Sequence, residues 1–315
     1  MLEYTLRRIV GTIPVVLGIL AISFFVLYLV PGNPAETLAG PRADADAIAR
    51  IAHEMGLDQP LHVRFFGYIG KMMRGDLGRS AINDRPVLTS IIEKFPYTLK
   101  LSILAMIVSI ISGLVAGIIG ALRRGTFIDR LCTVFSVSGI SVPIFLTGLV
   151  LLYVFAVKLR WLPISADNCP HPWMGLILPA ITLGIRSGAF LARIVRSSLI
   201  EVLNQDYIRT ARAKGLSPWR ILTRHALLNA LIPIVTVIGL DISSFLNGSV
   251  IVETIFGIPG LGRFTMESIL KRDYPVIQGI VLFAALVFVT INLVIDLLYA
   301  WINPRIRDEI LAGKS

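Results

Sequence analysis

Residues 101–122 read LSILAMIVSIISGLVAGIIGAL, a run of 22 residues without a charged side chain. A lipid bilayer offers backbone amides no hydrogen-bond partners, so about 20 consecutive apolar residues cross it as an α-helix that satisfies its own backbone. A surface in water would not tolerate so long an apolar run. The stretch therefore predicts a helix that spans a membrane.

Five further segments meet or approach the same test. Single charges interrupt three of them: Arg186 lies in the fourth segment of the chain, Asp241 in the fifth, and Asp296 near the end of the sixth. The sequence thus predicts an all-α, polytopic membrane protein with about six spans. The five further segments are residues 9–30, 131–157, 173–192, 231–252 and 276–302.

The composition supports this class. Apolar residues make up 55% of the 315 positions and charged residues 16%, whereas an ordinary soluble domain has about 45–50% and about 25%. The net charge of +10 lies beside the apolar segments, where membrane topology alone requires basic residues, so it does not indicate nucleic-acid binding. The two cysteines, Cys132 and Cys169, provide no disulfide framework.

Basic residues are concentrated in the connections 123–130, 193–224 and 305–314, and the positive-inside rule places these connections in the cytoplasm. Segments 31–97 and 158–172 then lie on the other side, and both chain termini are cytoplasmic. The first apolar segment lacks a small-x-small cleavage site, so we expect it to remain as a span and not to be removed as a signal peptide. These features predict a multi-pass protein of the cell membrane, inner or plasma.

The topology divides the chain into four regions. Within the second, a helical periodicity ends at Gly56, and Phe65 and Phe66 indicate an amphipathic helix at the membrane interface or packed against neighbouring spans. The regions are a cytoplasmic end with the first span (1–30), an extracytoplasmic cap (31–97), a core membrane domain with five spans (98–302) and a cytoplasmic tail (303–315).

The longest cytoplasmic connection, residues 193–230, is called the basic loop below, and its sequence predicts a helix, a break and a second helix. The first helix is expected over residues 201–214. Gly215 can adopt the left-handed conformation that ends a helix, Ser217 can cap the next helix, and Pro218 fits its first turn. The second helix is expected to continue to the start of the fifth span.

A rigid helical hairpin between two spans could act as a lever, because a partner that grips it would tilt both spans together. A folded connection that merely joins two helices is the structural alternative. A helix-turn-helix that reads DNA is disfavoured, since short tethers to two spans would hold the second helix against the lipid headgroups.

A charge inside a bilayer costs free energy unless it faces water or a partner, so Asp241 and Arg186 are candidate functional residues. Ser244 and Asn247 follow Asp241 at intervals of three residues, which places the three side chains along one helical face. This face is a candidate translocation pathway, where a carboxylate would attract an ammonium terminus or a cationic solute. The alternative is a structural ion pair of Asp241 with Arg186 or with a partner subunit.

Small residues and a proline predict local features of two spans. Gly113 and Gly117 have Gly-x-x-x-Gly spacing and Gly120 follows, which favours close packing against a neighbouring helix. Pro143 is expected to kink the third span.

No constellation of residues predicts an enzyme. The four histidines are scattered without a His-Glu-x-x-His pair, and Ser187 lacks an obvious basic partner. The C-terminal Gly-Lys-Ser at 313–315 lacks the rest of a P-loop. An ion-coupled secondary transporter is an alternative on physical grounds, but it needs no basic hairpin for an external motor.

Asp167, Cys169 and His171 lie within five residues of a predicted loop and could ligate a soft divalent metal such as nickel. An ordinary polar turn is the simpler interpretation, so no metal site is assigned.

Several runs of sequence form a distinctive set. The basic loop contains DYIRTARAKGL at 206–216, followed by RHALLNALIP at 224–233. Others are RR at 7–8, IP at 13–14, VPGNP at 30–34, GDLG at 75–78, ETIF at 253–256, PGLGR at 259–263, RDYPVIQ at 272–278, NLVIDLLY at 292–299 and NPRIR at 303–307. Together these runs resemble the permease subunits of binding-protein-dependent ABC importers, in particular the peptide and nickel branch, over nearly the whole chain.

The resemblance implies a type I ABC importer permease that alternates access while separate ATPase subunits act on the basic loop. The implied partners are a second homologous permease subunit, two ATP-binding cassette subunits and an extracytoplasmic solute-binding protein, within membrane lipid. The chain itself would bind no cofactor, because ATP and Mg would be held by the ATPase subunits. The implied substrate is a di- or oligopeptide, with a nickel chelate or glutathione as the alternatives.

The basic loop departs from the wider importer pattern of Glu-Ala-Ala, three residues, Gly and then Ile-x-Leu-Pro. Arg209, Thr210 and Ala211 stand where Glu-Ala-Ala would, and Leu227-Leu228 replaces Leu-Pro. The polar contact to an ATPase would then come from Arg209 or Arg212. The residues expected to couple to the ATPase are Arg209, Thr210, Ala211, Arg212, Gly215, Leu216, Trp219 and Arg224.

Overall fold

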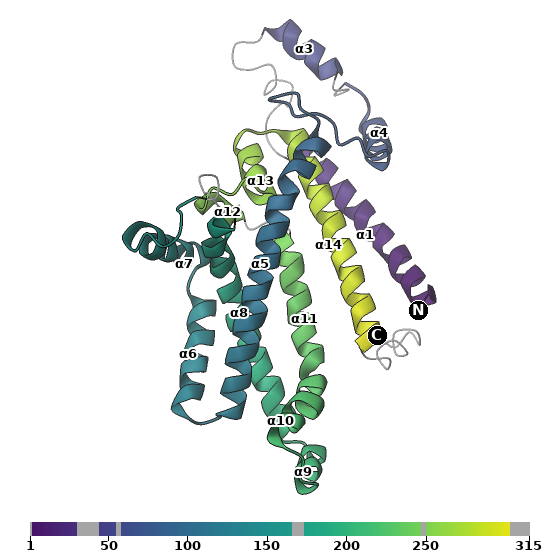
Figure 1. The fold of residues 1–315 in the computed structure, drawn as a ribbon. Helices are drawn as coiled ribbons and strands as arrows, with labels where there is room; N and C mark the ends of the chain where they lie inside the picture. The colour runs from purple at the N-terminus through teal and green to yellow at the C-terminus, as the bar shows by residue number, and fades with distance from the viewer. Residues whose placement is uncertain (1, 30–43, 55–57, 166–172, 247–249, 303–315) are drawn as a thin grey trace. The chain divides into compact units, whose positions relative to one another are not determined.

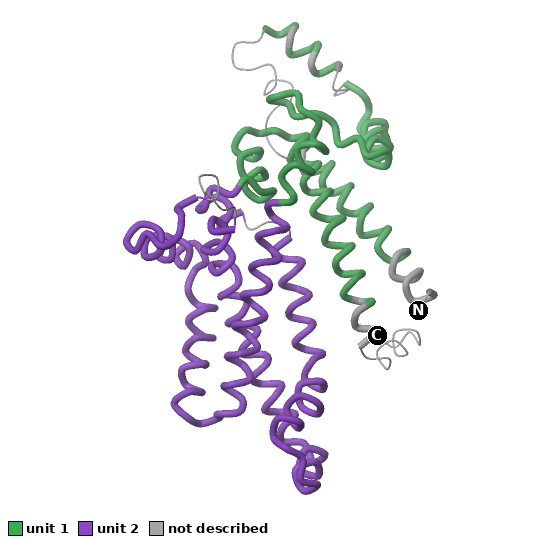
Figure 2. The backbone as a smooth tube through the Cα atoms, in the orientation of Figure 1, with its two compact units in different colours: residues 1–96, 259–315 green, residues 97–258 purple. Residues whose placement is uncertain are grey.

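The fold is all-α, as the sequence predicts (Figure 1). The described chain contains no β-strand beyond an isolated bridge between Arg79 and Pro86. Two compact units are present, residues 97–258 and residues 1–96 with 259–315 (Figure 2). The computed structural model describes residues 2–29, 44–54, 58–165, 173–246 and 250–302.

Each of the six segments expected to span the membrane contains helix within the described residues. Four helices in the described chain are long and apolar enough to cross a bilayer, and a bent pair of helices makes a fifth. The first segment forms α1 (Leu2–Leu29), in which Val10–Phe25 is an apolar stretch. The four long helices are α5 (Val87–Leu122), α8 (Met174–Leu203), the continuous helix Pro218–Leu246 and the segment Tyr274–Ile295 of α14 (Tyr274–Ile302).

Helix α8 is the centre of the unit 97–258. It packs against α6 (Phe127–Ser141) and α11 (Leu227–Leu246), and also against α7 (Ile144–Leu151) and α12 (Val250–Ile255). On the side of α11, its buried residues Leu191, Val195 and Leu199 share one apolar cluster with Ala226, Ala230 and Ile234. The fourth span is thus longer than the predicted 173–192, because its apolar contacts continue to the end of α8.

Glycines let α5 and α8 approach closely, which confirms the packing role predicted for Gly113 and Gly117. A methyl group at Gly113 would lie 2.8 Å from Leu191 Cβ, and one at Gly117 would lie 2.5 Å from Val195 Cβ. From the other side, Gly184 of α8 leaves only 2.5 Å between an added Cβ and the Ala105 carbonyl oxygen. Such contacts supply the attraction between helices in lipid, where burial of apolar surface does not.

The third span is bent far more sharply than the predicted kink. Its two parts, Phe127–Ser141 and Ile144–Lys158, meet at an angle of 107°. Val142 is extended (φ −75°, ψ 127°), because proline disfavours the helical conformation of the residue before it. After Pro143 the chain forms α7 (Ile144–Leu151) and the π-helix η1 (Leu152–Lys158).

The fifth span also differs from its predicted bounds of 231–252. It begins earlier, because the helix from the basic loop continues through Pro233 without a break. The described helix ends at Leu246, and a separate short helix, α12 (Val250–Ile255), follows.

The unit of residues 1–96 and 259–315 has its own packing. Helix α14 packs against α1 and against α13 (Leu261–Leu270). Val87, Ile91 and Val276 are buried in a common cluster. Nearby, the buried Asp273 carboxylate accepts hydrogen bonds from the Ser80 hydroxyl and the Ala81 amide, which ties the loop before α5 to the start of α14.

Two short helices lie in the segment predicted to form the cap. They are α3 (Ala45–Glu54) and α4 (Leu61–Met73), while the predicted stop at Gly56 lies outside the described residues. In α4, Phe65 packs on Phe24 of α1 at a ring distance of 5.3 Å, whereas Phe66 is 69% exposed. The helix therefore both contacts a span and presents an apolar side chain outward, as an interfacial helix does.

The α5–α8 contact predicts that Gly117→Ala destabilises the chain by about 1–3 kcal/mol, because the added methyl overpacks against Val195 and the Ala192 carbonyl. The matched control is Gly18→Ala in α1, where an added Cβ has no neighbour within 4 Å. Thermal unfolding of the purified chain in detergent measures both. Equal melting temperatures for the two variants would contradict the close contact.

Candidate functional site

The basic loop folds back sharply on itself. A single helix over 201–214 was the expectation, but α8 continues to Leu203 and a new helix, α9 (Asp206–Ala213), follows extended Gln205. The prediction of the helix bounds is therefore wrong. The reason lies in the tertiary packing: the break brings the buried face of α9, Ile208 and Ala211, onto Ile221.

The predicted turn after α9 is confirmed. Gly215 has φ +75°, the left-handed conformation that ends a helix at low cost only for glycine. The Ser217 hydroxyl accepts a hydrogen bond from the Arg220 amide at 3.4 Å, and Pro218 occupies the first helical position. From there α10 (Pro218–Arg220), the π-helix η2 (Ile221–Ala226) and α11 run on as one continuous helix.

The residues expected to contact an ATPase differ in exposure. Ala211 is buried against Ile208 and Ile221, so it stabilises the hairpin from within, and Leu216 is half-buried. Trp219 is 72% exposed at the start of the second helix. The other exposed residues of the set are Arg209, Thr210, Arg212, Gly215 and Arg224.

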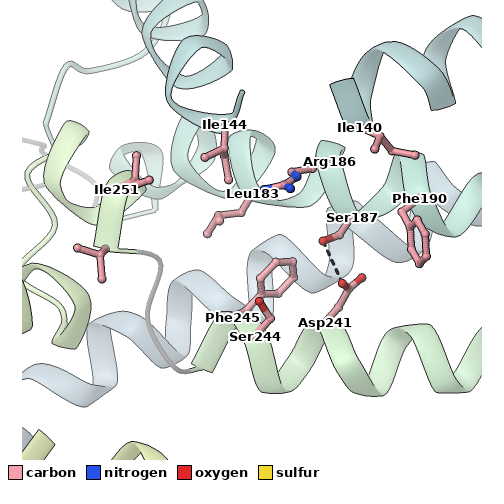
Figure 3. Close-up of a pocket in the computed structure, with 11 residues that line it drawn as sticks. Ile140, Ile144, Leu183, Arg186, Ser187, Phe190, Asp241, Ser244, Phe245 and Ile251 are labelled. Carbon is pink, nitrogen blue, oxygen red and sulfur yellow. Dashed lines mark hydrogen bonds between the residues drawn. The ribbon is translucent and has the colours of Figure 1, made fainter. Parts of the chain in front are cut away.

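A cavity of about 550 Å³ lies among the helices of the same unit (Figure 3). Its polar residues are Arg186 and Ser187 of α8 and Asp241 and Ser244 of α11. The apolar lining is Ile140, Ile144, Leu183, Phe190, Phe245, Val250 and Ile251. The predicted face of the fifth span therefore does border an open space, although Asn247 lies outside the described residues.

The Asp241 carboxylate is only partly satisfied within the protein. Its Oδ1 accepts a hydrogen bond from the Ser187 hydroxyl at 3.1 Å, the contact drawn in Figure 3. Ser109 of α5 also lies near the carboxylate, but Oδ2 is buried without a partner of hydrogen-bond geometry among the described residues. A buried oxygen in this state favours a donor brought by a ligand or by water.

Arg186 lines the same cavity but forms no ion pair with Asp241 in the described chain. Its side chain is exposed, and Figure 3 shows it directed away from the carboxylate. The neighbouring Ser187 takes the position that faces Asp241 instead. The structural ion pair between Arg186 and Asp241, the alternative that the sequence left open, is therefore absent from this part of the protein.

Two contacts in or near the site were not predicted from the sequence. Ser187 was considered only as a nucleophile without a base, whereas its partner is a carboxylate 54 positions away. The other contact is the ion pair of Arg196 with Asp129, in which the guanidinium donates two hydrogen bonds, at 2.6 and 2.9 Å. Asp129 also accepts a hydrogen bond from the Gly125 amide, so this pair ties the α5–α6 turn to the part of α8 that begins the basic loop.

The three residues considered for metal binding, Asp167, Cys169 and His171, lie outside the described residues. Within those residues, no group of three or more His, Cys, Asp or Glu side chains is placed to hold a metal ion.

The fold and the site define a class of protein, a multi-pass membrane permease. It has a polar cavity among its spans, and an exposed basic hairpin connects two of these spans. Residues 113–308 match the family described as binding-protein-dependent transport system inner membrane component, and residues 1–102 match its N-terminal counterpart. The chain belongs to this family and is an ABC importer permease of the peptide and nickel type. Its relatives are permease subunits of transporters.

Individual relatives agree with this assignment. The chain is 46% identical over 308 residues to the glutathione transport system permease protein GsiC of Salmonella typhimurium (strain LT2), covering 98% of this chain and 99% of the relative. The same figures hold for GsiC of Escherichia coli (strain K12).

Solved structures share the fold at low sequence identity. An inward-facing MetNI methionine ABC transporter aligns with a TM-score of 0.57 and 17% identity, over 68% of this chain and 96% of that one. An amino acid ABC transporter with histidines aligns with a TM-score of 0.54 and 20% identity, over 67% and 92%. These likenesses confirm the fold alone.

The ion pair beside the basic loop predicts that Asp129→Ala destabilises the chain by about 2–4 kcal/mol, because it leaves the Arg196 guanidinium unpaired. Arg196 is partly exposed, which lessens the loss. The double variant Asp129→Ala/Arg196→Met is expected to recover part of it, since no unpaired charge remains. Thermal unfolding in detergent tests this, and a double variant as unstable as the sum of its two single variants would contradict it.

Proposed function

We propose that this chain moves di- and oligopeptides across the cytoplasmic membrane by alternating access, driven by ATP hydrolysis on separate subunits. The cavity around Asp241 carries this proposal. Its volume of about 550 Å³ falls within the range of about 300–1,000 Å³ typical of small-molecule sites. A carboxylate in such a place attracts a cationic group, since a charge within a bilayer needs a counterpart or water. We assign Asp241, Ser244, Arg186 and Asn247 to the translocation pathway.

The two helices that border the cavity both lead to the basic loop. Helix α8 carries Ser187 and ends where the loop turns, at Leu203, and the helix that starts at Pro218 carries Asp241. At about 1.5 Å per residue, Asp241 lies about 30 Å along its helix from Ile221. A force on α9 would therefore reach both sides of the Ser187–Asp241 hydrogen bond through rigid elements.

The exposed residues of the basic loop fit a docking surface for an ATPase subunit. Arg209, Arg212 and Arg224 supply positive charge, and Trp219 supplies a large exposed aromatic of the kind enriched in interfaces. We assign Thr210, Ala211, Gly215 and Leu216 to the same coupling hairpin, in which buried Ala211 serves the packing of α9.

The proposed assembly contains this chain, a second homologous permease subunit, two ATP-binding cassette subunits and an extracytoplasmic solute-binding protein. The family description, which specifies a binding-protein-dependent system, supports the last of these. In this assembly ATP and Mg are bound by the ATPase subunits, this chain binds no cofactor, and both of its termini are cytoplasmic.

Glutathione is a second candidate solute. The observation that favours it is the 46% identity to glutathione transport permeases over nearly the whole chain. Glutathione is itself a tripeptide, so the same cavity and the same mechanism would serve it. Competition between glutathione and a dipeptide for ATP-driven uptake separates the two candidates.

The pathway assignment predicts that Asp241→Asn lowers peptide uptake by at least about tenfold, because a neutral amide loses the attraction for an ammonium group. Uptake of labelled dialanine and glutathione into proteoliposomes containing the assembled transporter measures the effect. The control variant is Asp46→Asn, an exposed position on α3. Normal uptake by a fully assembled Asp241→Asn transporter would remove Asp241 from the pathway.

If the hairpin of the basic loop transmits force as a rigid lever, Gly215→Val is expected to reduce the amount of solute transported per ATP hydrolysed. A β-branched residue costs about 1–2 kcal/mol at φ +75° and distorts the turn. An added Cβ meets no atom within 4 Å, so the effect comes from the backbone alone. Gly215→Asn is the matched control, since asparagine tolerates this conformation. Undiminished coupling in the valine variant would count against a rigid turn.

A further inference from the structure

The cavity holds two opposite charges that do not neutralise each other. Asp241 and Arg186 both line it, yet no ion pair joins them in the described chain. Opposite charges in one cavity attract each other, yet the Arg186 side chain is exposed and directed away from the carboxylate (Figure 3). Here, adjacent positions on α8 point in different directions, and Ser187 occupies the place beside the carboxylate.

Each charge has unused hydrogen-bonding capacity. Asp241 Oδ2 is buried, and among the described residues it has Ser109 nearby but no donor of hydrogen-bond geometry. The Arg186 side chain is exposed and forms no ion pair within the same residues. A carboxylate oxygen accepts well from an ammonium group, and a guanidinium donates two parallel hydrogen bonds to a carboxylate. The two groups are thus complementary to the two ends of a zwitterion.

Apart from Ser187 and Ser244, the remaining lining is apolar, and it has no further charged side chain. Phe190 and Phe245 lie near the carboxylate, and Ile144 and Ile251 lie farther along the cavity (Figure 3). Such walls accept side chains of many shapes because they impose no directional hydrogen bonds. A site with charged ends and apolar walls selects for the charged termini and is indifferent to what lies between them.

We propose that this cavity recognises peptide solutes by their termini, with Asp241 binding the α-ammonium group and Arg186 binding the α-carboxylate. The inference rests on the proposed function and names its substrate class, short peptides with both termini free. Glutathione falls within this class, because it carries an α-ammonium group and free carboxylates.

The test uses three probes, dialanine, N-acetyl-dialanine and dialanine amide, on the assembled transporter in nanodiscs without its solute-binding protein. Ser244→Cys places a thiol in the cavity, in a background where Cys132 and Cys169 are replaced by serine. The rate of maleimide labelling at this thiol reports occupancy of the cavity. This readout is independent of which peptides the solute-binding protein selects.

Dialanine is expected to protect the thiol, and each blocked analogue should require about tenfold more peptide for half-protection, because one charged hydrogen-bonded contact is lost. In Asp241→Asn the difference between dialanine and its N-acetyl form should vanish while the amide stays weaker. In Arg186→Gln the difference between dialanine and its amide should vanish while the N-acetyl form stays weaker. Arg130→Gln, an exposed change outside the cavity, should keep both differences.

Equal half-protection by the three probes, no protection by any of them, or unchanged discrimination in the two cavity variants would overturn the proposal. ATP-driven uptake of dialanine and glutathione by the complete transporter, solute-binding protein included, is measured alongside. If both peptides are taken up but the labelling assay shows no difference between dialanine and its blocked analogues, the recognition of termini is wrong and the permease function is still supported. Uptake of neither peptide contradicts the permease function itself.

Discussion

The structure depends on the requirement that a backbone in lipid satisfies its own hydrogen bonds. This requirement makes each long apolar segment a helix. The lipid around the helices is as apolar as their side chains, so no hydrophobic driving force brings the helices together. Close contact has to replace that force. Helix α8 is an example. On one side it packs against Gly113 and Gly117 of α5. On another, a methyl group at Gly139 of α6 would lie 2.5 Å from Ala189 Cβ of α8. The central helix is therefore held by van der Waals contact on two sides.

The rigidity of α8 has a consequence for the basic loop. Its buried residues share a cluster with the helix that returns from the loop, so the two helices that flank the hairpin form one packed pair. The Arg196–Asp129 ion pair adds the α5–α6 turn to the same body. Movement of the hairpin would then displace α8 and α11 together, and the Ser187–Asp241 contact lies where those two helices border the cavity.

The relatives show how much of this arrangement belongs to the fold and how much to the particular chain. The MetNI transporter shares the fold at 17% identity, so very different sequences form the same helical framework. The charges of the cavity are individual side chains on that framework.

The sequence by itself determined the class of protein, the helical segments and the local signals within them. The run of 22 apolar residues requires a helix in lipid, and Gly215, Ser217 and Pro218 act on their immediate neighbours, so the turn they form could be predicted without the rest of the chain. Asp241 and Ser244 share a face for the same local reason. Tertiary structure decided the 107° bend at Pro143, the return of α9 onto Ile221 and the choice of Ser187 over Arg186 as the neighbour of Asp241. These features depend on how distant helices pack and rotate against each other. The spacing of residues along one helix does not determine that rotation.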